Sequence, residues 1–196
     1  TYWKIPASSP TAVYGEWVLG PAHKLIQAIL DAVPDIELIA EDLGDIRKEV
    51  IELEEDFNIP GMDVILFRMN PKQLKSQTKQ NVCIYTGTHD NATVNQEYQD
   101  YSKNKRINLR RFFKKNGYDH RNFNDLICHF VLDSNADIAI LPIWDICGFK
   151  KEARINFPGT ISDENWTWKL KDYKGFEQEM MKTREWIVSS NRENQQ

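Results

Sequence analysis

The segment that decides the fold is residues 82–91, which reads Val-Cys-Ile-Tyr-Thr-Gly-Thr-His-Asp-Asn. A short apolar run ends in a turn that carries a histidine, a carboxylate and an amide. A second segment has the same plan, because the mainly apolar residues 36–40 lead into Glu-Asp-Leu-Gly at 41–44. Strands that end in this way deliver carboxylates to the edge of a sheet. Such an arrangement suits sugar chemistry, where one acid donates a proton while another stays charged.

Apolar runs of strand length alternate along the chain with stretches of helical periodicity. The predicted strands are residues 36–40, 62–67, 82–85 and 136–143, and the predicted helices are residues 21–33, 46–57, 107–115, 122–132 and 174–190. This alternation is typical of β/α units with parallel strands. Gly20-Pro21 is predicted to open the first helix, and Asp45 to cap the second. Residues 1–20 are predicted to form a loop, because Pro and Gly interrupt any regular pattern.

The conspicuous polar residues each follow a predicted strand: they are Glu41, Asn70, Asp90 and Asp145. In a (β/α)8 barrel the active site lies at this end of the strands. A whole barrel needs eight strands and typically about 250 residues, whereas this chain has 196 residues and half the strands. We therefore predict an α/β fold that is the C-terminal half of a (β/α)8 TIM-type barrel. Residues 1–196 would form one partial catalytic domain without the N-terminal half.

The composition of the chain indicates a globular protein and argues against nucleic acid and membrane as partners. Hydrophobic residues make up 41% of the chain and the net charge is −4, which favours a globular protein. Nucleic acid is not a predicted partner, because no long basic run occurs; residues 114–121 are interpreted as a solvated helix end. No apolar run reaches the roughly 18 residues of a membrane helix, and no signal peptide is visible. The cysteines are odd in number and widely spaced, which favours a reducing, cytoplasmic location.

Glu41 is the first candidate for catalysis. It follows the apolar Leu38-Ile39-Ala40, and burial there would raise its pKa toward the range that a general acid needs. Adjacent side chains at the end of a strand point in opposite directions, so only one of Glu41 and Asp42 can face the centre of the rim. An acidic turn that caps a helix is the alternative interpretation.

His89 and Asp90 form the second candidate site. A metal site usually needs three or more convergent ligands, and no third appears at a suitable spacing, so no metal and no cofactor is predicted. A clamp for carbohydrate hydroxyls, made by His89, Asp90 and Asn91, fits these residue types better, and an ordinary turn is the alternative. No nucleophile elbow, P-loop or dinucleotide fingerprint occurs. His129 and each of the six tryptophans are interpreted first as packing residues.

Eight segments resemble the C-terminal part of the 4-α-glucanotransferases, also called amylomaltases or disproportionating enzymes (glycoside hydrolase family 77). These segments are YWKIPA (2–7), GEWVLGP (15–21), IAEDLG (39–44), PGM (60–62), YTGTHDN (85–91), DICG (145–148), ARINFPGT (153–160) and NWTW (165–168). They occur in the family's order and spacing and cover most of the chain.

The resemblance implies a retaining transfer of α-1,4-glucan segments between maltooligosaccharides. An aspartate would hold the glycosyl part covalently until the 4-hydroxyl of a second glucan accepts it. Glu41 would be the general acid/base. Asp90 would hold substrate hydroxyls and stabilise the oxocarbenium-like transition state. The remaining substrate-binding residues would be His89, Asn156, Asp42 and Trp3.

The family's nucleophile lies in an Arg-x-Asp-His-Phe-Arg-Gly motif immediately before the YWxIPA segment, and this chain begins at Thr1. Retaining chemistry needs a pair of carboxylates, so the 196 residues are expected to be inactive alone. The chain also departs from the family's usual residues at Trp144, at Ile146-Cys147 and at Ala92, which bears on acceptor preference. Two other hypotheses stay open: a non-catalytic half-barrel that binds glucans, and a structural half-barrel that dimerises. The oligomeric state is not predicted.

Overall fold

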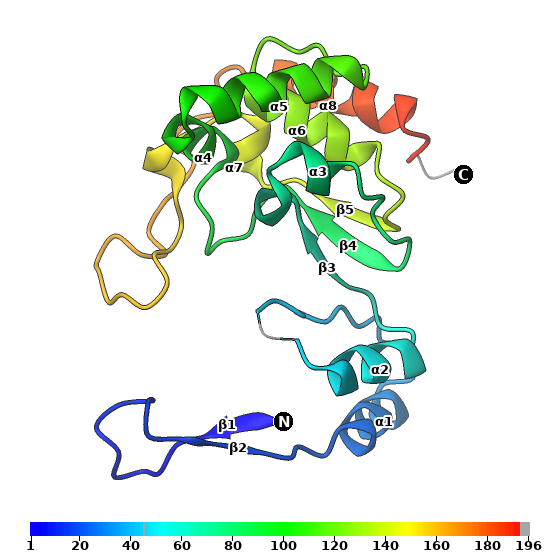
Figure 1. Cartoon of the computed structure of the whole chain (residues 1–196), viewed down its shortest axis with the longest axis vertical. Helices are drawn as coiled ribbons and strands as arrows, with labels where there is room; N and C mark the ends of the chain where they lie inside the picture. The colour runs from blue at the N-terminus through cyan, green and yellow to red at the C-terminus, as the bar shows by residue number, and fades with distance from the viewer. Residues whose placement is uncertain (45, 193–196) are drawn as a thin grey trace. The chain divides into compact units, whose positions relative to one another are not determined.

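A computed structural model describes residues 1–44 and 46–192 of the chain. The chain divides into two compact units, Thr1–Gly61 and Met62–Gln196, and each is described by itself (Figure 1). No helix within the described residues is long and apolar enough to cross a membrane. The assignment of residues 1–196 to one partial barrel domain stays a prediction.

The first unit begins with a β-hairpin where the sequence predicted a loop. Strand β1 (Tyr2–Lys4) pairs antiparallel with β2 (Glu16–Val18), and Trp3 stands opposite Trp17. Their rings lie 5.3 Å apart, edge to face. Aromatic residues favour strands, and a cross-strand aromatic pair stabilises the ladder. This pairing outweighs the prolines and glycines of the connecting segment, so the loop prediction was wrong for both strands.

Two helices follow in the first unit, as predicted. Helix α1 (His23–Ala32) begins two residues after Pro21, and α2 (Lys48–Asp56) has Arg47 at its N-cap. The predicted cap, Asp45, lies outside the described residues. A hydrogen bond of 2.7 Å between His23 Nε2 and Asp56 Oδ2 links the start of α1 to the end of α2.

Residues 36–40 form no strand, which corrects the first strand prediction. Among the residues described, one backbone hydrogen bond of 2.9 Å, from Ala40 N–H to Pro60 C=O, connects this segment to the approach to strand β3. One such bond does not make a ladder. Leu38 and Ala40 are half-buried, and Ile39 is 45% exposed. The apolar run therefore packs on one side only and does not form the buried strand that its composition indicated.

The second unit holds all but the first residue, Gly61, of a three-stranded sheet in the order β3-β4-β5. The sheet is made by β3 (Gly61–Val64), β4 (Val82–Tyr85) and β5 (Ile138–Ile140). Strands β4 and β5 run parallel, with Cys83 opposite Ile138. Strand β4 has the predicted bounds, whereas β3 and β5 are shorter than predicted. The chain leaves β3 through the 3-10 helix η1 (Ile65–Arg68), and Pro142 caps α7 (Ile143–Ile146) soon after β5. The predicted α/β class is confirmed; the four-strand half-barrel is not.

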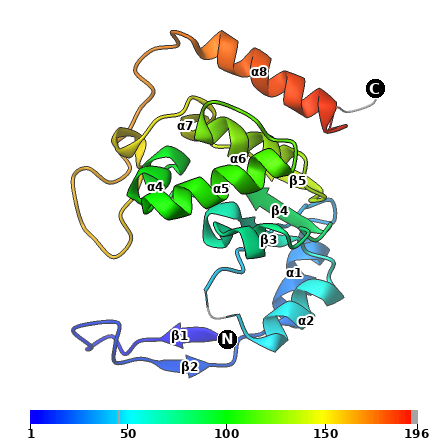
Figure 2. The same cartoon turned by 45° about the horizontal axis from the view of Figure 1, so that its top comes forward.

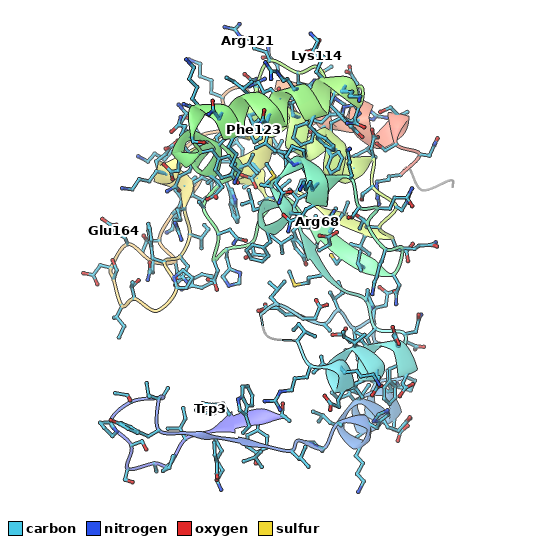
Figure 3. All side chains as sticks on the ribbon, in the orientation of Figure 1. Trp3, Arg68, Lys114, Arg121, Phe123 and Glu164 are labelled. Atoms are coloured by element: carbon cyan, nitrogen blue, oxygen red, sulfur yellow. The ribbon has the colours of Figure 1, made fainter. Side chains whose placement is uncertain are left out.

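The helices of the second unit lie on one side of this sheet (Figures 1 and 2). They are α3 (Pro71–Leu74), α4 (Val94–Asp100), α5 (Lys103–Lys115), α6 (Phe123–Leu132) and α8 (Phe176–Ser189), with the 3-10 helix η2 (Lys151–Ala153). The core combines strand and helix residues, among them Ile84, Val94, Leu109, Phe113 and Ile127. Figure 3 shows Phe123 beneath α5, where its ring stacks on Tyr98 at 3.8 Å.

Helix α8 packs through Trp186 onto a histidine pair. His129 of α6 stacks on the Trp186 ring at 5.4 Å, and His120 Nε2 lies 2.9 Å from His129 Nδ1. Burial lowers the pKa of His129, while nearby Asp133 raises it. These contacts agree with the interpretation of His129 as a packing residue. At the end of α5, the exposed Lys114 pairs with Asp119 at 3.0 Å, as expected of a solvated helix end.

Candidate functional site

The residues after β4 form a tight turn that projects two side chains. Asn91 Oδ1 accepts hydrogen bonds from Thr88 N–H at 2.8 Å and from the Thr88 hydroxyl at 3.0 Å. The Asn91 N–H in turn donates to Thr88 C=O at 3.1 Å. Asparagine side chains commonly close turns in this way. Asn91 therefore closes the turn through its Oδ1, as the alternative interpretation of an ordinary turn expects, and the clamp made by His89, Asp90 and Asn91 stays a prediction. The side chains of His89 and Asp90 are each 45% exposed.

A second loop, distant in sequence, brings Asn156 to Asp90. Asn156 Nδ2 donates to Asp90 Oδ1 at 2.7 Å, across a separation of 66 residues. Arg154 supports the contact, because its Nε donates to Asn156 C=O at 3.0 Å and its Nη2 to Asp90 C=O at 3.4 Å. His89 Nε2 lies 3.4 Å from Asp90 Oδ1. The structure thus brings three predicted site residues, His89, Asp90 and Asn156, to one corner.

Trp166 and Arg154 also belong to this corner, although the sequence did not predict them as site residues. The Trp166 ring lies 5.0 Å from the His89 ring at 37°, and the Arg154 guanidinium stacks over the Phe157 ring at 4.2 Å. Their only signal in the sequence is membership of the ARINFPGT and NWTW segments. Figure 3 shows Glu164 on the loop that joins these segments.

Asp145 is buried and does not face an open rim. It is 1% exposed; its Oδ2 accepts from the Thr86 hydroxyl at 2.5 Å and its Oδ1 from Val94 N–H at 2.8 Å. These bonds tie the end of β4 to the start of α4. The expectation that Asp145 faces the rim was therefore wrong. Asn70 is also structural, because its side chain caps α3 by accepting from the N–H groups of Lys72 and Gln73.

Burial raises the pKa of Asp145 to about 6, although the hydrogen bonds from Thr86 and Val94 act to lower it. The folded chain therefore keeps this proton to higher pH than the unfolded chain does. Because its pKa is raised in the folded chain, the protonated Asp145 contributes fully to the free energy of unfolding below about pH 4. This contribution is lost as the pH rises through 6. Two pKa units correspond to about 3 kcal/mol.

We expect Asp145→Asn to remove this pH dependence. The amide has the same shape, can accept from Val94 and can donate to the Thr86 hydroxyl. Between pH 4.5 and 7.5 the variant should gain about 2 kcal/mol relative to the unsubstituted chain in urea unfolding followed by circular dichroism. Asp137→Asn, at an exposed carboxylate, is the control and should show no such gain. Equal pH dependence in the Asp145→Asn and unsubstituted chains would show that Asp145 does not titrate in this range.

The other predicted site residues, Glu41, Asp42 and Trp3, belong to the first unit. Glu41 is exposed, which corrects the expectation of burial, and Asp42 is half-buried. The Asp42 carboxylate lies against the backbone at Gly61, where an added Cβ would stand 2.5 Å from Oδ2. Gly61 in the PGM segment thus leaves room for Asp42. Trp3 Nε1–H donates to Ala12 C=O at 2.7 Å, so the polar edge of this ring is already engaged.

A pocket of about 390 Å³ lies elsewhere, between α4, α5 and α6, and none of the predicted site residues lines it. Its Arg110 guanidinium is committed to structure, because it donates to the Tyr98 hydroxyl and to two backbone carbonyls at 2.9–3.2 Å. Within residues 1–44 and 46–192, no three His, Cys, Asp or Glu side chains are grouped so as to hold a metal ion.

Comparison with known proteins identifies the family of the chain. The profile of the family described as 4-alpha-glucanotransferase (glycoside hydrolase family 77) matches residues 1–174. The chain is 36% identical over 178 residues to the 4-alpha-glucanotransferase of Thermus thermophilus, covering 86% of this chain and 35% of that protein. It is 32% identical over 181 residues to the chloroplastic/amyloplastic 4-alpha-glucanotransferase of Solanum tuberosum, covering 90% and 31%.

A solved structure is similar as well. The amylomaltase from Streptococcus agalactiae in complex with acarbose superposes with a TM-score of 0.84 at 22% identity, covering 98% of this chain and 39% of that one. This likeness shows an α/β fold shared with part of that enzyme. With the family match, it follows that the chain belongs to the 4-alpha-glucanotransferases of glycoside hydrolase family 77. It spans about a third of the length of the curated relatives it matches.

Proposed function

We propose that this chain carries the general acid/base and a transition-state-stabilising carboxylate of a 4-α-glucanotransferase. The enzyme would transfer α-1,4-glucan segments between maltooligosaccharides with retention of configuration. In this reaction Glu41 protonates the departing glycosidic oxygen and then accepts the proton of the incoming 4-hydroxyl. The covalent intermediate would form on an aspartate upstream of Tyr2, in the motif that the family places there.

The hydrogen bond between Asn156 and Asp90 is the observation that supports this proposal most. It fixes Oδ1 of an otherwise accessible carboxylate, and Oδ2 accepts no hydrogen bond from the residues that the structure describes. A carboxylate with one oxygen anchored and the other open is suited to hold sugar hydroxyls. Because it is anionic and already oriented, it stabilises positive charge on the sugar ring without reorganisation. His89, beside it, supplies a further hydrogen-bonding group.

The contrast between Glu41 and Asp42 supports their separate roles. Glu41 is exposed and makes no hydrogen bond or ion pair with the described part of the chain, which leaves its carboxyl free for proton transfer. Asp42 is held beside Gly61, so it would bind substrate with a fixed orientation. Trp3 would contact substrate with its ring face, since its N–H is engaged by Ala12.

The finer architecture is part of the same proposal. Three strands flanked by helices, and the likeness to a solved amylomaltase, support the C-terminal half of a (β/α)8 barrel. Three cysteines without a disulfide among the described residues support a reducing, cytoplasmic location. We expect the 196-residue chain alone to be inactive, because it spans about a third of its relatives.

Acceptor labelling tests the activity. It requires the extended polypeptide, defined here as this chain lengthened upstream to the length of its curated relatives, so that it includes the Arg-x-Asp-His-Phe-Arg-Gly motif and the N-terminal half of the barrel. Incubated with maltoheptaose and ¹³C-labelled glucose, it should place the label at the reducing end of longer maltooligosaccharides. Proton NMR should show only α-1,4 linkages at the new bond. A rise in reducing ends with no labelled oligosaccharide would identify a hydrolase instead, and β-linkages would exclude retention.

A non-catalytic glucan-binding role is the second candidate, and a specific observation favours it. The corner of His89, Asp90 and Asn156 is complete within the second unit of this chain. Titration calorimetry of the 196-residue chain with maltoheptaose tests this role. Binding by the chain, together with absence of transfer by the extended polypeptide, would favour the binding module over the enzyme.

A further inference from the structure

Trp166 adopts a backbone conformation that a bulky residue rarely takes. Its φ angle is +63°, in the left-handed region, where the Cβ of an L-residue crowds its own backbone. The surrounding loop enforces this conformation: Trp166 N–H donates to Ile155 C=O at 2.8 Å, and Asn165 Oδ1 accepts from Phe157 N–H at 3.2 Å. Strained residues held by their surroundings occur preferentially at binding and catalytic sites.

The strain does not serve to bury the indole ring. Trp166 is 64% exposed, and its ring lies 5.0 Å from the His89 imidazole. The neighbouring Trp168, two residues along, is half-buried and packs edge-on against Trp144 and Phe149. Trp168 therefore has the role of a packing residue, whereas Trp166 is held open to solvent beside His89, the neighbour of Asp90.

We infer that Trp166 is a positioning and specificity-determining residue, which stacks on a glucose ring of the glucan and fixes the orientation of the His89 imidazole. The inference rests on the proposed function. An exposed indole offers a flat apolar face, and the C–H face of a pyranose is the apolar side of an otherwise polar sugar. The ring bound on Trp166 would lie next to the ring whose hydroxyls Asp90 holds. Trp166 would thereby favour glucans long enough to occupy both positions.

The test compares Trp166→Phe, Trp166→Ala and Trp166→Gly in the extended polypeptide. We expect Ala and Gly to raise KM for maltotriose about tenfold with a smaller change in kcat, and Phe to restore most of the loss. Gly relieves the left-handed strain, so its urea midpoint should equal or exceed that of Ala while its KM stays high. Tyr173→Ala removes another exposed aromatic ring, 74% exposed, and should leave KM unchanged. Values of KM within twofold of the unsubstituted enzyme for both Ala and Gly would overturn the inference.

A second readout needs no activity. In the 196-residue chain, removal of the indole ring should shift the His89 imidazole NMR signals, and maltoheptaose should perturb those signals in the unsubstituted chain but not in Trp166→Gly. An inactive extended polypeptide with this perturbation intact would refute the transfer reaction and keep the role of Trp166. An active extended polypeptide whose KM does not change on replacement of Trp166 would support the transfer reaction and refute the proposed role of Trp166. Unshifted His89 signals in Trp166→Gly would exclude the positioning role.

Discussion

Glu41→Gln in the extended polypeptide is expected to lower kcat for maltotriose by about 10³-fold, within the range for loss of a general acid/base. Glutamine keeps the shape of the side chain but cannot supply a proton to the leaving oxygen. Glu41 is exposed and makes no hydrogen bond or ion pair to the described residues, so its replacement should leave the urea midpoint unchanged. Initial rates of glucose release measure the effect.

The chemistry of the leaving group separates this role from a structural one. Fluoride departs without a proton and azide attacks without a base, so Glu41→Gln should regain most of its activity with α-maltosyl fluoride and azide. Glu37→Gln changes an exposed carboxylate four residues away and serves as the matched control, with no expected loss. If the Glu41→Gln variant stays equally impaired with the fluoride donor, Glu41 is not the acid/base.

Asp90→Asn is expected to lower kcat by about 10²–10⁴-fold, because contacts that strengthen in the transition state supply several kcal/mol. An amide can still accept the hydrogen bond from Asn156, so the corner should persist. It carries no charge, however, and cannot stabilise positive charge on the sugar ring. Asp163→Asn, on an exposed loop carboxylate, is the control. Steady-state kinetics with maltotriose provide the measurement.

The fluoride donor should not rescue Asp90→Asn, since the positive charge develops on the ring whatever the leaving group. This difference between Asp90 and Glu41 follows directly from their proposed roles. Recovery of the Asp90→Asn variant with α-maltosyl fluoride would assign Asp90 to proton transfer, and an unchanged kcat for maltotriose would remove it from the site.

The accuracy of the fold prediction depended on how local the determining interactions are. Strand β4 was predicted with its bounds because its apolar residues are flanked by turn residues. The hairpin of β1 and β2 was missed, since pairing of Trp3 with Trp17 depends on contact across the turn. Residues 36–40 have the composition of a buried strand, but strand formation requires a ladder of partners, and among the described residues one backbone hydrogen bond links this run to a distant segment.

In the candidate site, too, local contacts could be predicted from the sequence, whereas contacts between distant segments could not. The residues of the turn after β4 were sufficient to predict His89 and Asp90 as neighbouring candidate site residues. Asn156 was predicted as a site residue only through the family resemblance, because no pattern in the sequence reveals a contact across 66 positions. Asp145 was placed on the rim by its position after a strand, yet its two hydrogen bonds draw it into the core. Trp166 was missed because a positive φ angle at a tryptophan has no signature in the sequence.

The most direct test of the central claim is glucose release from maltotriose by the 196-residue chain and by the extended polypeptide, side by side. We expect glucose, with matching formation of longer glucans, from the extended polypeptide only. Turnover by the 196-residue chain alone would contradict the assignment of the nucleophile to the upstream motif. Absence of turnover in both, with the extended polypeptide folded, would contradict the proposed transferase activity.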